Sequence, residues 1–426
     1  MIGKKINFIV LTIIVLFIAF TATSYQELTS SINKADTAWM LVASAFVLLM
    51  TPGLSFFYGG MINKKNVIST MLQSFVALGV ISVLWVLVGF SLAFGDSIGG
   101  IIGNPFTYFN FKDVGVEPNP DFSDSIPFLL YALFQLKFAI ITPALITGSF
   151  AGRIRFRSYI LFMVLFSLLI YSPLAHMTWH PDGLFRNWGV LDFAGGTVVH
   201  MSAGFAALAG ALYLGKRKVA EETHANVPYV ILGTGMLWFG WFGFNAGSAL
   251  GANGDAVIAF ANTNIASATA MIAWLFYERF MGRKMSAVGA CIGAVVGLVA
   301  ITPAAGFVNI GQSVVIGFVA SIISNWMIHL KNKSGIDDTL DVFPSHGIGG
   351  VVGMLLTAVF AANVGLVYGE TETFYYHIIT LFLTAIFTFG GSYLLFKIVD
   401  VLVKMRVRED QEERGLDISQ HGEQIE

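Results

Sequence analysis

Runs of apolar residues recur along almost the whole chain, and each is about as long as a lipid bilayer is thick. A transmembrane helix needs about 20 mostly apolar residues to cross the hydrocarbon core. Eleven such runs follow residue 36, at 37–60, 67–94, 126–150, 159–179, 192–214, 229–250, 256–277, 287–308, 312–330, 339–362 and 375–403. The pattern predicts an all-α polytopic membrane protein with eleven transmembrane helices.

The first 24 residues form a shorter apolar stretch with a different pattern. Lys4 and Lys5 precede it, and Ala22 and Ser24 provide small residues at its end. This order is typical of a secretory signal peptide that is removed from the mature protein. The alternative is an additional helix that is not cleaved, and either interpretation places residues 25–36 outside the cell.

Basic residues cluster in every second connection between the predicted spans. The clusters follow spans one, three, five, seven, nine and eleven: Lys64 and Lys65; Arg153, Arg155 and Arg157; Lys216, Arg217 and Lys218; Arg279, Arg283 and Lys284; Lys331 and Lys333; Lys404, Arg406 and Arg408. Cytoplasmic loops of membrane proteins carry the excess of Lys and Arg. We therefore expect a multi-pass protein of the cytoplasmic membrane, with the mature N-terminus outside and residues 404–426 as a cytoplasmic tail.

Composition narrows the classes of function. Of the 426 residues, 56% are hydrophobic and 12% are charged, and Cys291 is the single cysteine. One cysteine forms neither an intramolecular disulfide nor a thiolate metal site. The sequence has no HExxH motif, no nucleotide-binding glycine loop and no basic nucleic-acid-binding segment. We expect no enzyme activity, no cofactor, no bound metal and no nucleic-acid partner, only membrane lipid around the helices.

Two sequence patterns recur five spans apart. The motif ITPA occurs at 141–144 and again at 301–304, and an aspartate precedes a histidine by eight residues in the fifth and tenth spans. Because five is an odd number, the second set of spans crosses the membrane in the opposite sense, as in inverted-repeat transporters. We expect a five-helix repeat at 37–214, an inverted five-helix repeat at 229–362, and an eleventh helix at 375–403.

The aspartate–histidine pairs are Asp192 with His200 and Asp338 with His346. Eight helical residues cover about 12 Å, so the histidines, entering from opposite faces of a core about 30 Å thick, should approach each other. Ionisable groups at such depth usually face a cavity or a partner, although an interhelical hydrogen bond is the structural alternative for each histidine. The aspartates lie near helix N-termini, where capping explains a carboxylate, and we assign both a structural role.

Aromatic residues on the predicted spans suggest a path for a cation. Phe134 and Phe138 are four residues apart, and Trp241 and Phe244 are three apart, so each pair shares a helix face. Trp179 ends the fourth span on the outer side. Helix packing and the interfacial aromatic belt are the ordinary explanations. A cation would nevertheless be attracted to each ring face by about 0.5–2 kcal/mol.

Seven segments, in this order, are similar to one known family. They are MLVASAFVLLMTPGLSFFYGG, FQLKFAIITPALITGSFAGRIRF, AHMTW, LDFAGGTVVH, WFGFNAGSA, DVFPSHGIGG and EERGLDISQHGE. They resemble the ammonium transporter (Amt/Rh) family, in its Amt branch of bacterial type. The likeness covers nearly everything after residue 36, and DFAGGTVVH is highly specific.

The resemblance implies a homotrimer in which each subunit has its own pore between the two repeats. It assigns Phe134, Trp179 and Ser248 to an outer ammonium-binding vestibule, Phe138 and Phe244 to a gate, His200 and His346 to the pore with Trp241 beside them, and Asp192 to support of the vestibule. Lys137 departs from the family pattern, which has a small or apolar residue there. It points about 100° away from Phe138 around the helix, so we expect it to face another helix or the subunit contact.

The resemblance also implies a mechanism and a partner. Ammonium, or its analogue methylammonium, loses its proton at the vestibule because a dry pore disfavours charge, and ammonia passes the two histidines. Our hypothesis adds separate proton transfer between the imidazoles. The tail is expected to regulate transport and to meet a cytoplasmic PII-type signalling protein. The alternatives are an ammonium sensor that binds and signals without moving much substrate, a gas channel for neutral ammonia or carbon dioxide, and a membrane enzyme that uses His200 and His346 as metal ligands. The enzyme would need a third ligand at the same depth, and the sequence offers none.

Overall fold

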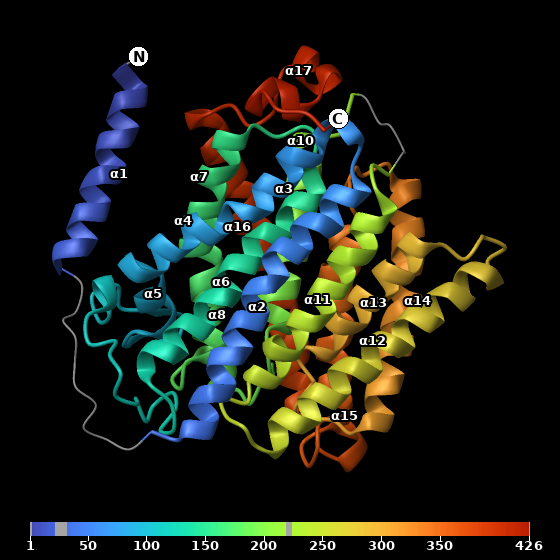
Figure 1. Cartoon of the computed structure of the whole chain (residues 1–426). Coiled ribbons are helices and arrows are strands. Elements are labelled where there is room, and N and C mark those ends of the chain that lie inside the picture. Colours follow the sequence, from blue (N-terminus) through green and yellow to red (C-terminus); the bar gives the residue numbers. More distant parts are fainter. Residues whose placement is uncertain (1, 22–31, 219–223, 426) are drawn as a thin grey trace.

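The computed structural model describes residues 2–21, 32–218 and 224–425, and these are mostly helical (Figure 1). Within them, ten helical stretches are long and apolar enough to cross a membrane: Lys34–Met61, Lys64–Phe94, Phe128–Phe150, Phe156–Asn187, Gly196–Leu214, Val227–Gly247, Gly254–Phe280, Ile310–Ser334, Phe343–Phe360 and Glu372–Leu402. Each coincides with one of the predicted spans. The prediction of an all-α membrane protein is confirmed.

Several of these stretches are built from shorter helices joined end to end. In the first half of the chain the elements are α1 (Ile2–Thr21), α2 (Lys34–Met61), η1 (Lys64–Asn66), α3 (Val67–Phe75), α4 (Ala77–Leu84), η2 (Trp85–Gly89), α5 (Phe90–Phe94), β1 (Ser97–Ile98), β2 (Ile102–Gly103), η3 (Phe109–Phe111), α6 (Phe128–Phe150), α7 (Phe156–Phe166), η4 (Ser167–Tyr171), α8 (Ser172–Trp179), α9 (Leu184–Asn187), η5 (Gly196–Met201) and α10 (Ser202–Leu214). Strands β1 and β2 pair antiparallel, with Ser97 opposite Gly103.

The second half continues with similar elements. They are α11 (Val227–Gly247), α12 (Gly254–Phe280), α13 (Ala287–Ile301), α14 (Ile310–Ser334), η6 (Phe343–Ile348), α15 (Gly349–Phe360), η7 (Leu366–Tyr368), α16 (Glu372–Leu402), α17 (Glu409–Arg414) and η8 (Asp417–His421). The turns η5 and η6 are π-helical. Single π-helical turns within helices occur often at functional sites.

The eighth predicted span, at 287–308, is shorter than expected. Helix α13 has 15 residues and ends at Ile301, so a count of eleven full-length spans is not confirmed. Pro303 disfavours helical conformation in the residue before it. Beyond the helix end, the backbone oxygen of Pro303 accepts a hydrogen bond from the N–H of Phe193 at 3.1 Å. The Asn262 side chain donates to the backbone oxygens of Ala305 and Val308, so non-helical backbone there is satisfied by protein, as membrane burial requires.

Helix α1 lies at the side of the bundle rather than within it (Figure 1). Its contacts with the rest of the chain include a hydrogen bond from the Asn110 side chain to the Thr21 hydroxyl at 2.6 Å. The rings of Phe17 and Phe109 meet edge to face, with their centroids 6.0 Å apart. Residues 22–24, where signal cleavage is predicted, lie outside the described residues, and the signal peptide stays a prediction.

The C-terminal tail packs against one end of the bundle, opposite the end where α2 begins (Figure 1). Ile154 and Arg406 form an isolated antiparallel bridge, and the N–H of Arg155 donates to the oxygen of Met405 at 2.7 Å. Farther along, the carboxylate of Asp417 accepts hydrogen bonds from the N–H groups of Ser69 and Ile68, at 2.7 and 3.0 Å. The tail is therefore a docked element and not a solvated end.

Candidate functional site

Two spans cross at glycine and bring the predicted histidines together. A Cβ atom added to Gly204 would overlap the backbone of Gly347, so the backbones of the two helical segments touch with no side chain between them. Gly204 lies one helical turn after His200, and Gly347 directly follows His346. Small residues permit this close approach of helices in membranes. The crossing fixes the separation of the two imidazole rings.

The two imidazoles are in direct contact. Their Nδ1 atoms are 3.4 Å apart, and the ring centroids are 5.5 Å apart with an interplanar angle of 26°. Both histidines are buried, and Nε2 of His200 has no hydrogen-bond partner among the described residues. When both rings are neutral, one Nδ1 must donate and the other must accept.

A closed cluster of aromatic rings lies directly beside this pair. The centroids of Phe138 and Phe244 are only 4.2 Å apart, and both rings are buried. Trp241 stacks on His200, with centroids 5.4 Å apart. Its indole N–H donates to the hydroxyl of Thr302 at 2.9 Å, which fixes the orientation of the indole.

The predicted vestibule residues line one cavity of about 410 Å³, which we call the outer cavity. It lies where α8 and α11 end, and its lining includes Phe134, Phe138, Trp179 and Ser248. The hydroxyl of Ser248 donates to the oxygen of Phe244 at 2.9 Å. Because a hydroxyl donates only one hydrogen, the Ser248 oxygen keeps its acceptor capacity. The cavity thus combines aromatic faces with a hydrogen-bond acceptor.

Asp192 lines the outer cavity and caps η5, the turn that carries His200. One carboxylate oxygen accepts from the N–H groups of Gly195 and Gly196, at 2.8 and 2.6 Å. The other accepts from the N–H and the hydroxyl of Thr197. Gly195, with φ of 121°, adopts a conformation that favours glycine. Trp179 donates its indole N–H to the backbone oxygen of Asp192 at 3.1 Å, so cap and aromatic wall are held together.

A second cavity, of about 580 Å³, lies at the opposite end, where α11 begins, and we call it the inner cavity. Its lining includes the charged residues Lys216, Arg217, Lys331, Asp337, Asp338 and Asp341. Asp338 caps η6, the turn that carries His346, by accepting the N–H of Phe343 at 2.7 Å. Asp338 and Asp192 therefore occupy equivalent places before the two histidines.

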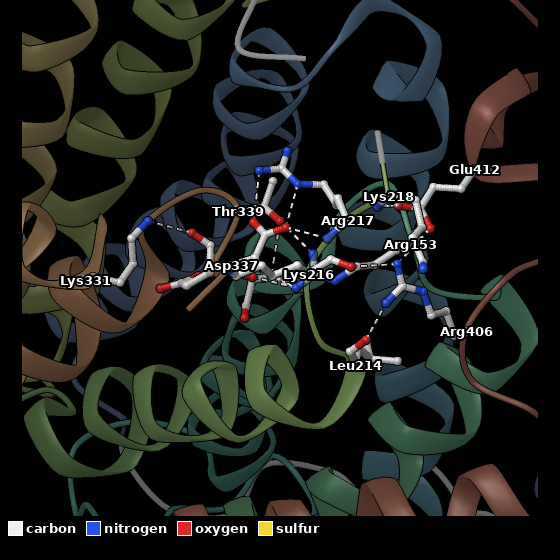
Figure 2. Close-up of polar contacts among 12 residues, drawn as sticks. Arg153, Leu214, Lys216, Arg217, Lys218, Lys331, Asp337, Thr339, Arg406 and Glu412 are labelled. Atoms are coloured by element: carbon white, nitrogen blue, oxygen red, sulfur yellow. Dashed lines mark hydrogen bonds and ion pairs between the residues drawn. The ribbon is translucent and has the colours of Figure 1, made fainter. Parts of the chain in front are cut away.

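Ion pairs hold the loop that contains Asp337 and Asp338 (Figure 2). Arg217 binds the carboxylate of Asp337 with two side-chain N–H groups, both at 2.9 Å, and with its backbone N–H at 2.8 Å. Arg153, which is fully buried, donates to the hydroxyl of Thr339 and to the backbone oxygen of Asp337. Burial lowers the pKa of Arg153 to about 10, so it remains charged at neutral pH. Although burial acts against it, pairing with Arg217 and Arg153 holds the pKa of Asp337 below its ordinary value.

The tail reaches the same region through Arg406 (Figure 2). Its guanidinium donates to the backbone oxygens of Leu214 and Lys216, at 2.6 and 2.7 Å, and pairs with Glu412 at 2.9 Å. Glu412 also accepts the backbone N–H of Lys218. The segment 214–218 is therefore held between the tail and the Asp337 loop.

Sequence reasoning missed two residues of this site, Thr302 and His377. His377 is buried in α16, where one ring nitrogen contacts the oxygen of Met354 at 3.0 Å and the other accepts the N–H of Leu191 at 2.9 Å. This hydrogen bond holds the backbone in place directly before Asp192. An ionisable residue within an apolar span was the available signal. Lys137 is half-buried and is absent from the described lining of the outer cavity.

The fold and the site define a helical membrane transport protein, with two mouths separated by a closed aromatic and imidazole barrier. Within the described residues, no group of three or more His, Cys, Asp and Glu side chains is arranged to hold a metal ion. The profile of the Ammonium Transporter Family matches residues 38–426. The chain belongs to this family, and it is a transporter and not an enzyme.

Relatives and solved structures agree with this assignment. A protein named "Ammonium transporter" from Aquifex aeolicus (strain VF5) is 48% identical over 412 residues, which cover 95% of this chain and 96% of that protein. The crystal structure of Saccharomyces cerevisiae Mep2 superposes with a TM-score of 0.84 at 34% identity, covering 90% of this chain and 89% of that one. A structure named "Sensor Amt Protein" also has a TM-score of 0.84, at 30% identity, covering 91% and 98%.

Proposed function

We propose that this protein transports ammonium by binding it in the outer cavity, removing its proton, and conducting ammonia past His200 and His346. One observation carries the proposal: a cavity lined by aromatic rings leads to a closed ring pair, behind which two imidazoles touch at 3.4 Å. Aromatic faces attract a cation, and the Ser248 oxygen accepts a hydrogen bond from it. Potassium cannot donate that bond.

The gate explains why the proton is removed. The rings of Phe138 and Phe244 leave no hydrated passage at a centroid separation of 4.2 Å. Burial in such surroundings disfavours the charged form of an amine and can lower its pKa by several units. Ammonium therefore gives up its proton on the outer side, and neutral ammonia crosses when the rings move apart.

The imidazole pair offers a separate route for that proton. Two neutral rings joined through Nδ1 share one hydrogen, so one Nε2 accepts while the other carries a hydrogen. A proton that arrives at the accepting Nε2 is balanced by release of another from the far ring, with transfer between the Nδ1 atoms. Net transport is then one positive charge per ammonium.

The arrangement of the whole chain follows from this function. We propose an outer N-terminus for the mature chain and an inner tail, supported by the opposite placement of the α2 start and the tail (Figure 1). The repeats at 37–214 and 229–362 meet at the histidine pair, and the protein is a homotrimer. The tail at 404–426 regulates transport and meets a PII-type protein at the inner face. The aspartate caps on η5 and η6 support the repeat assignment.

A sensor that binds ammonium without moving much of it is the second candidate. The similarity to the structure named "Sensor Amt Protein" favours it, because the two chains share a fold along nearly their whole length. Transport measurements separate the two candidates, since a sensor retains binding in the outer cavity while uptake is small.

Methylammonium uptake by cells that lack other ammonium carriers tests the proposal. We expect uptake with the wild-type chain, strongly reduced uptake with His200→Ala, and weaker substrate affinity with Trp179→Ala. His329→Ala and Trp326→Ala, which change exposed side chains on α14, are matched controls and should transport normally. Absence of uptake by well-expressed wild-type protein would favour the sensor, and normal uptake by His200→Ala would overturn the role of the pair.

A further inference from the structure

The loop before η6 contains three carboxylates, and two of them form ion pairs with cationic side chains among the described residues. Asp337 pairs with Arg217 at 2.9 Å, and Asp341 pairs with Lys331 at 2.5 Å. Asp338 receives the N–H of Phe343 on Oδ2, while its Oδ1 is buried and has no hydrogen-bond partner among the described residues. Lys331 also donates a hydrogen bond to Asp338, but to its backbone oxygen, at 3.0 Å. Asp338 is thus the incompletely satisfied carboxylate of the inner cavity.

An unpartnered carboxylate oxygen in such a place favours the protonated form. Asp338 is 1% exposed, and removing an ionised carboxylate from water is costly unless charges or hydrogen bonds compensate. The charged and titratable groups around it are Lys331 on α14, Asp337 and Asp341 on its own loop, Arg153 after α6, Tyr58 on α2, and Lys216, Arg217 and His224 in the lining of the inner cavity.

These surroundings act on Asp338 in opposite directions. Burial and then the charge of Asp341 raise the pKa of Asp338, while Lys331 and the nearby backbone N–H groups of Phe343 and Val342 lower it, and the net value is about 6. The group lies before the η6 span, on the wall of the inner cavity. Its charge state therefore changes when the inner solution becomes mildly acidic.

We propose that Asp338 is a positioning residue that senses inner pH: its carboxylate form holds the η6 turn, and its protonated form releases that turn and slows transport. The proposal rests on the transport function above, and it adds a control that this function does not require. Asp192 differs in its hydrogen bonding, because four donors occupy both of its oxygens.

The consequence of protonation follows from the position of the cap. A proton from the inner solution binds a carboxylate oxygen, and the anion at the N-terminus of η6 is neutralised. Helix N-termini favour negative charge, and a charge-assisted hydrogen bond is roughly twice as strong as a neutral one. The bond from the N–H of Phe343 therefore weakens. His346 lies three residues farther along the same turn, so its contact with His200 loosens as well.

An infrared titration of the purified protein in liposomes tests the charge state without any transport. The carbonyl band of a protonated carboxylic acid should grow with a midpoint at pH about 6 and should be missing from Asp338→Asn. Asp341→Asn removes a neighbouring negative charge and should move the midpoint to lower pH. Lys331→Gln removes a positive charge and should move it to higher pH. Asp410→Asn, at an exposed tail site, should change nothing.

Transport by the same liposomes tests the consequence. With outer conditions fixed, lowering the pH at the inner face through this midpoint should reduce wild-type transport severalfold, whereas Asp338→Asn should transport weakly at every pH. An infrared band that is insensitive to Asp338→Asn, or identical pH profiles for both proteins, would overturn the inference. Loss of all wild-type transport would instead refute the proposed function, because the infrared result stands apart from it.

Discussion

Each of the two mouths of this protein has an aspartate before a turn that carries a histidine, but the hydrogen bonds to the two aspartates differ. At the outer mouth, Asp192 accepts four hydrogen bonds from the turn that it caps. At the inner mouth, Asp338 accepts the N–H of Phe343, and its Oδ1 has no partner within the part of the chain that the structure describes. The outer cap is fixed by the local backbone, while the inner loop is held by ion pairs with distant segments.

The difference suggests what each mouth must do. In the proposed function the outer cavity selects its substrate by geometry, which requires rigid walls, and the backbone oxygen of Asp192 also holds Trp179. The inner loop is joined through Arg217 and Arg153 to segments near the tail. By the inference above, the inner mouth is therefore the end at which pH and contacts of the tail act on transport.

Removing each aspartate cap tests this asymmetry most strongly. Asp192→Ala leaves several buried donors unsatisfied at about 1–3 kcal/mol each, and we expect a loss of stability of roughly 4 kcal/mol. Asp338→Ala removes one hydrogen bond together with a buried charge, and should cost about 1 kcal/mol or less. Thermal unfolding in detergent measures both. Equal losses would show that the two caps do not differ.

The next prediction concerns the place where the two histidine-bearing spans cross, at Gly204 and Gly347. Gly204→Ala places a methyl group against the backbone of Gly347, and overpacking of this kind costs about 1–3 kcal/mol. The two imidazoles should separate, and methylammonium uptake should fall by an order of magnitude. Gly235→Ala is the matched control, because an added Cβ there meets nothing within 4 Å. Equal uptake by the two variants would contradict the role of the crossing.

Breaking the ion pair between Arg217 and Asp337 should have a smaller effect, which is on stability. Asp337→Asn leaves Arg217 unpaired at a site where both side chains are mostly buried, and should destabilise the protein by about 2 kcal/mol. Because the pKa of Asp337 is lowered in the folded protein, its contribution persists above its ordinary pKa and is lost only as pH falls through the lowered value. The loss of stability in Asp337→Asn should thus be the same at pH 7 and pH 5. Asp410→Asn breaks an exposed pair with Arg408, which solvent screens, and should leave the stability nearly unchanged.

The smallest expected change concerns the indole beside His200. Thr302→Val removes the acceptor for the Trp241 N–H, at a cost of about 1 kcal/mol, and should reduce uptake by a few fold. Thr142→Val is the matched control from the other copy of the ITPA motif. Its hydroxyl bonds only to the oxygen of Phe138 among the described residues, so uptake should be unchanged. A larger loss from Thr142→Val would reverse this assignment.

The apolar pattern was sufficient to predict the fold, because membrane burial leaves helices as nearly the only solution for backbone hydrogen bonding. The spacing of Asp192 to His200 and of Asp338 to His346 predicted where the imidazoles lie, since helical rise converts residue counts into depth. The end of α13 at Ile301 was not predicted. Helix α6 contains the other copy of the ITPA motif and continues through its proline, Pro143. Local sequence alone therefore does not decide whether a helix ends at this motif.

Contacts between segments that are far apart in the chain could not be predicted from the sequence. Thr302 meets Trp241 across 61 residues, and His377 meets Leu191 across 186. Nothing in local patterning indicates either contact. The difference between Asp192 and Asp338 was also hidden, because both have the same spacing to their histidine. It arises from how the backbone turns at Gly195 and from which charges other segments bring to Asp338.

The central claim is that charge and ammonia separate at the aromatic gate and travel past the paired imidazoles by different routes. Ammonium pulses applied to purified protein in liposomes, with current and internal alkalinisation recorded together, test it most directly. The account predicts a current in the wild type that is abolished in His200→Ala. Ammonia flux without any current in the wild type would contradict it and would identify a channel for the neutral gas.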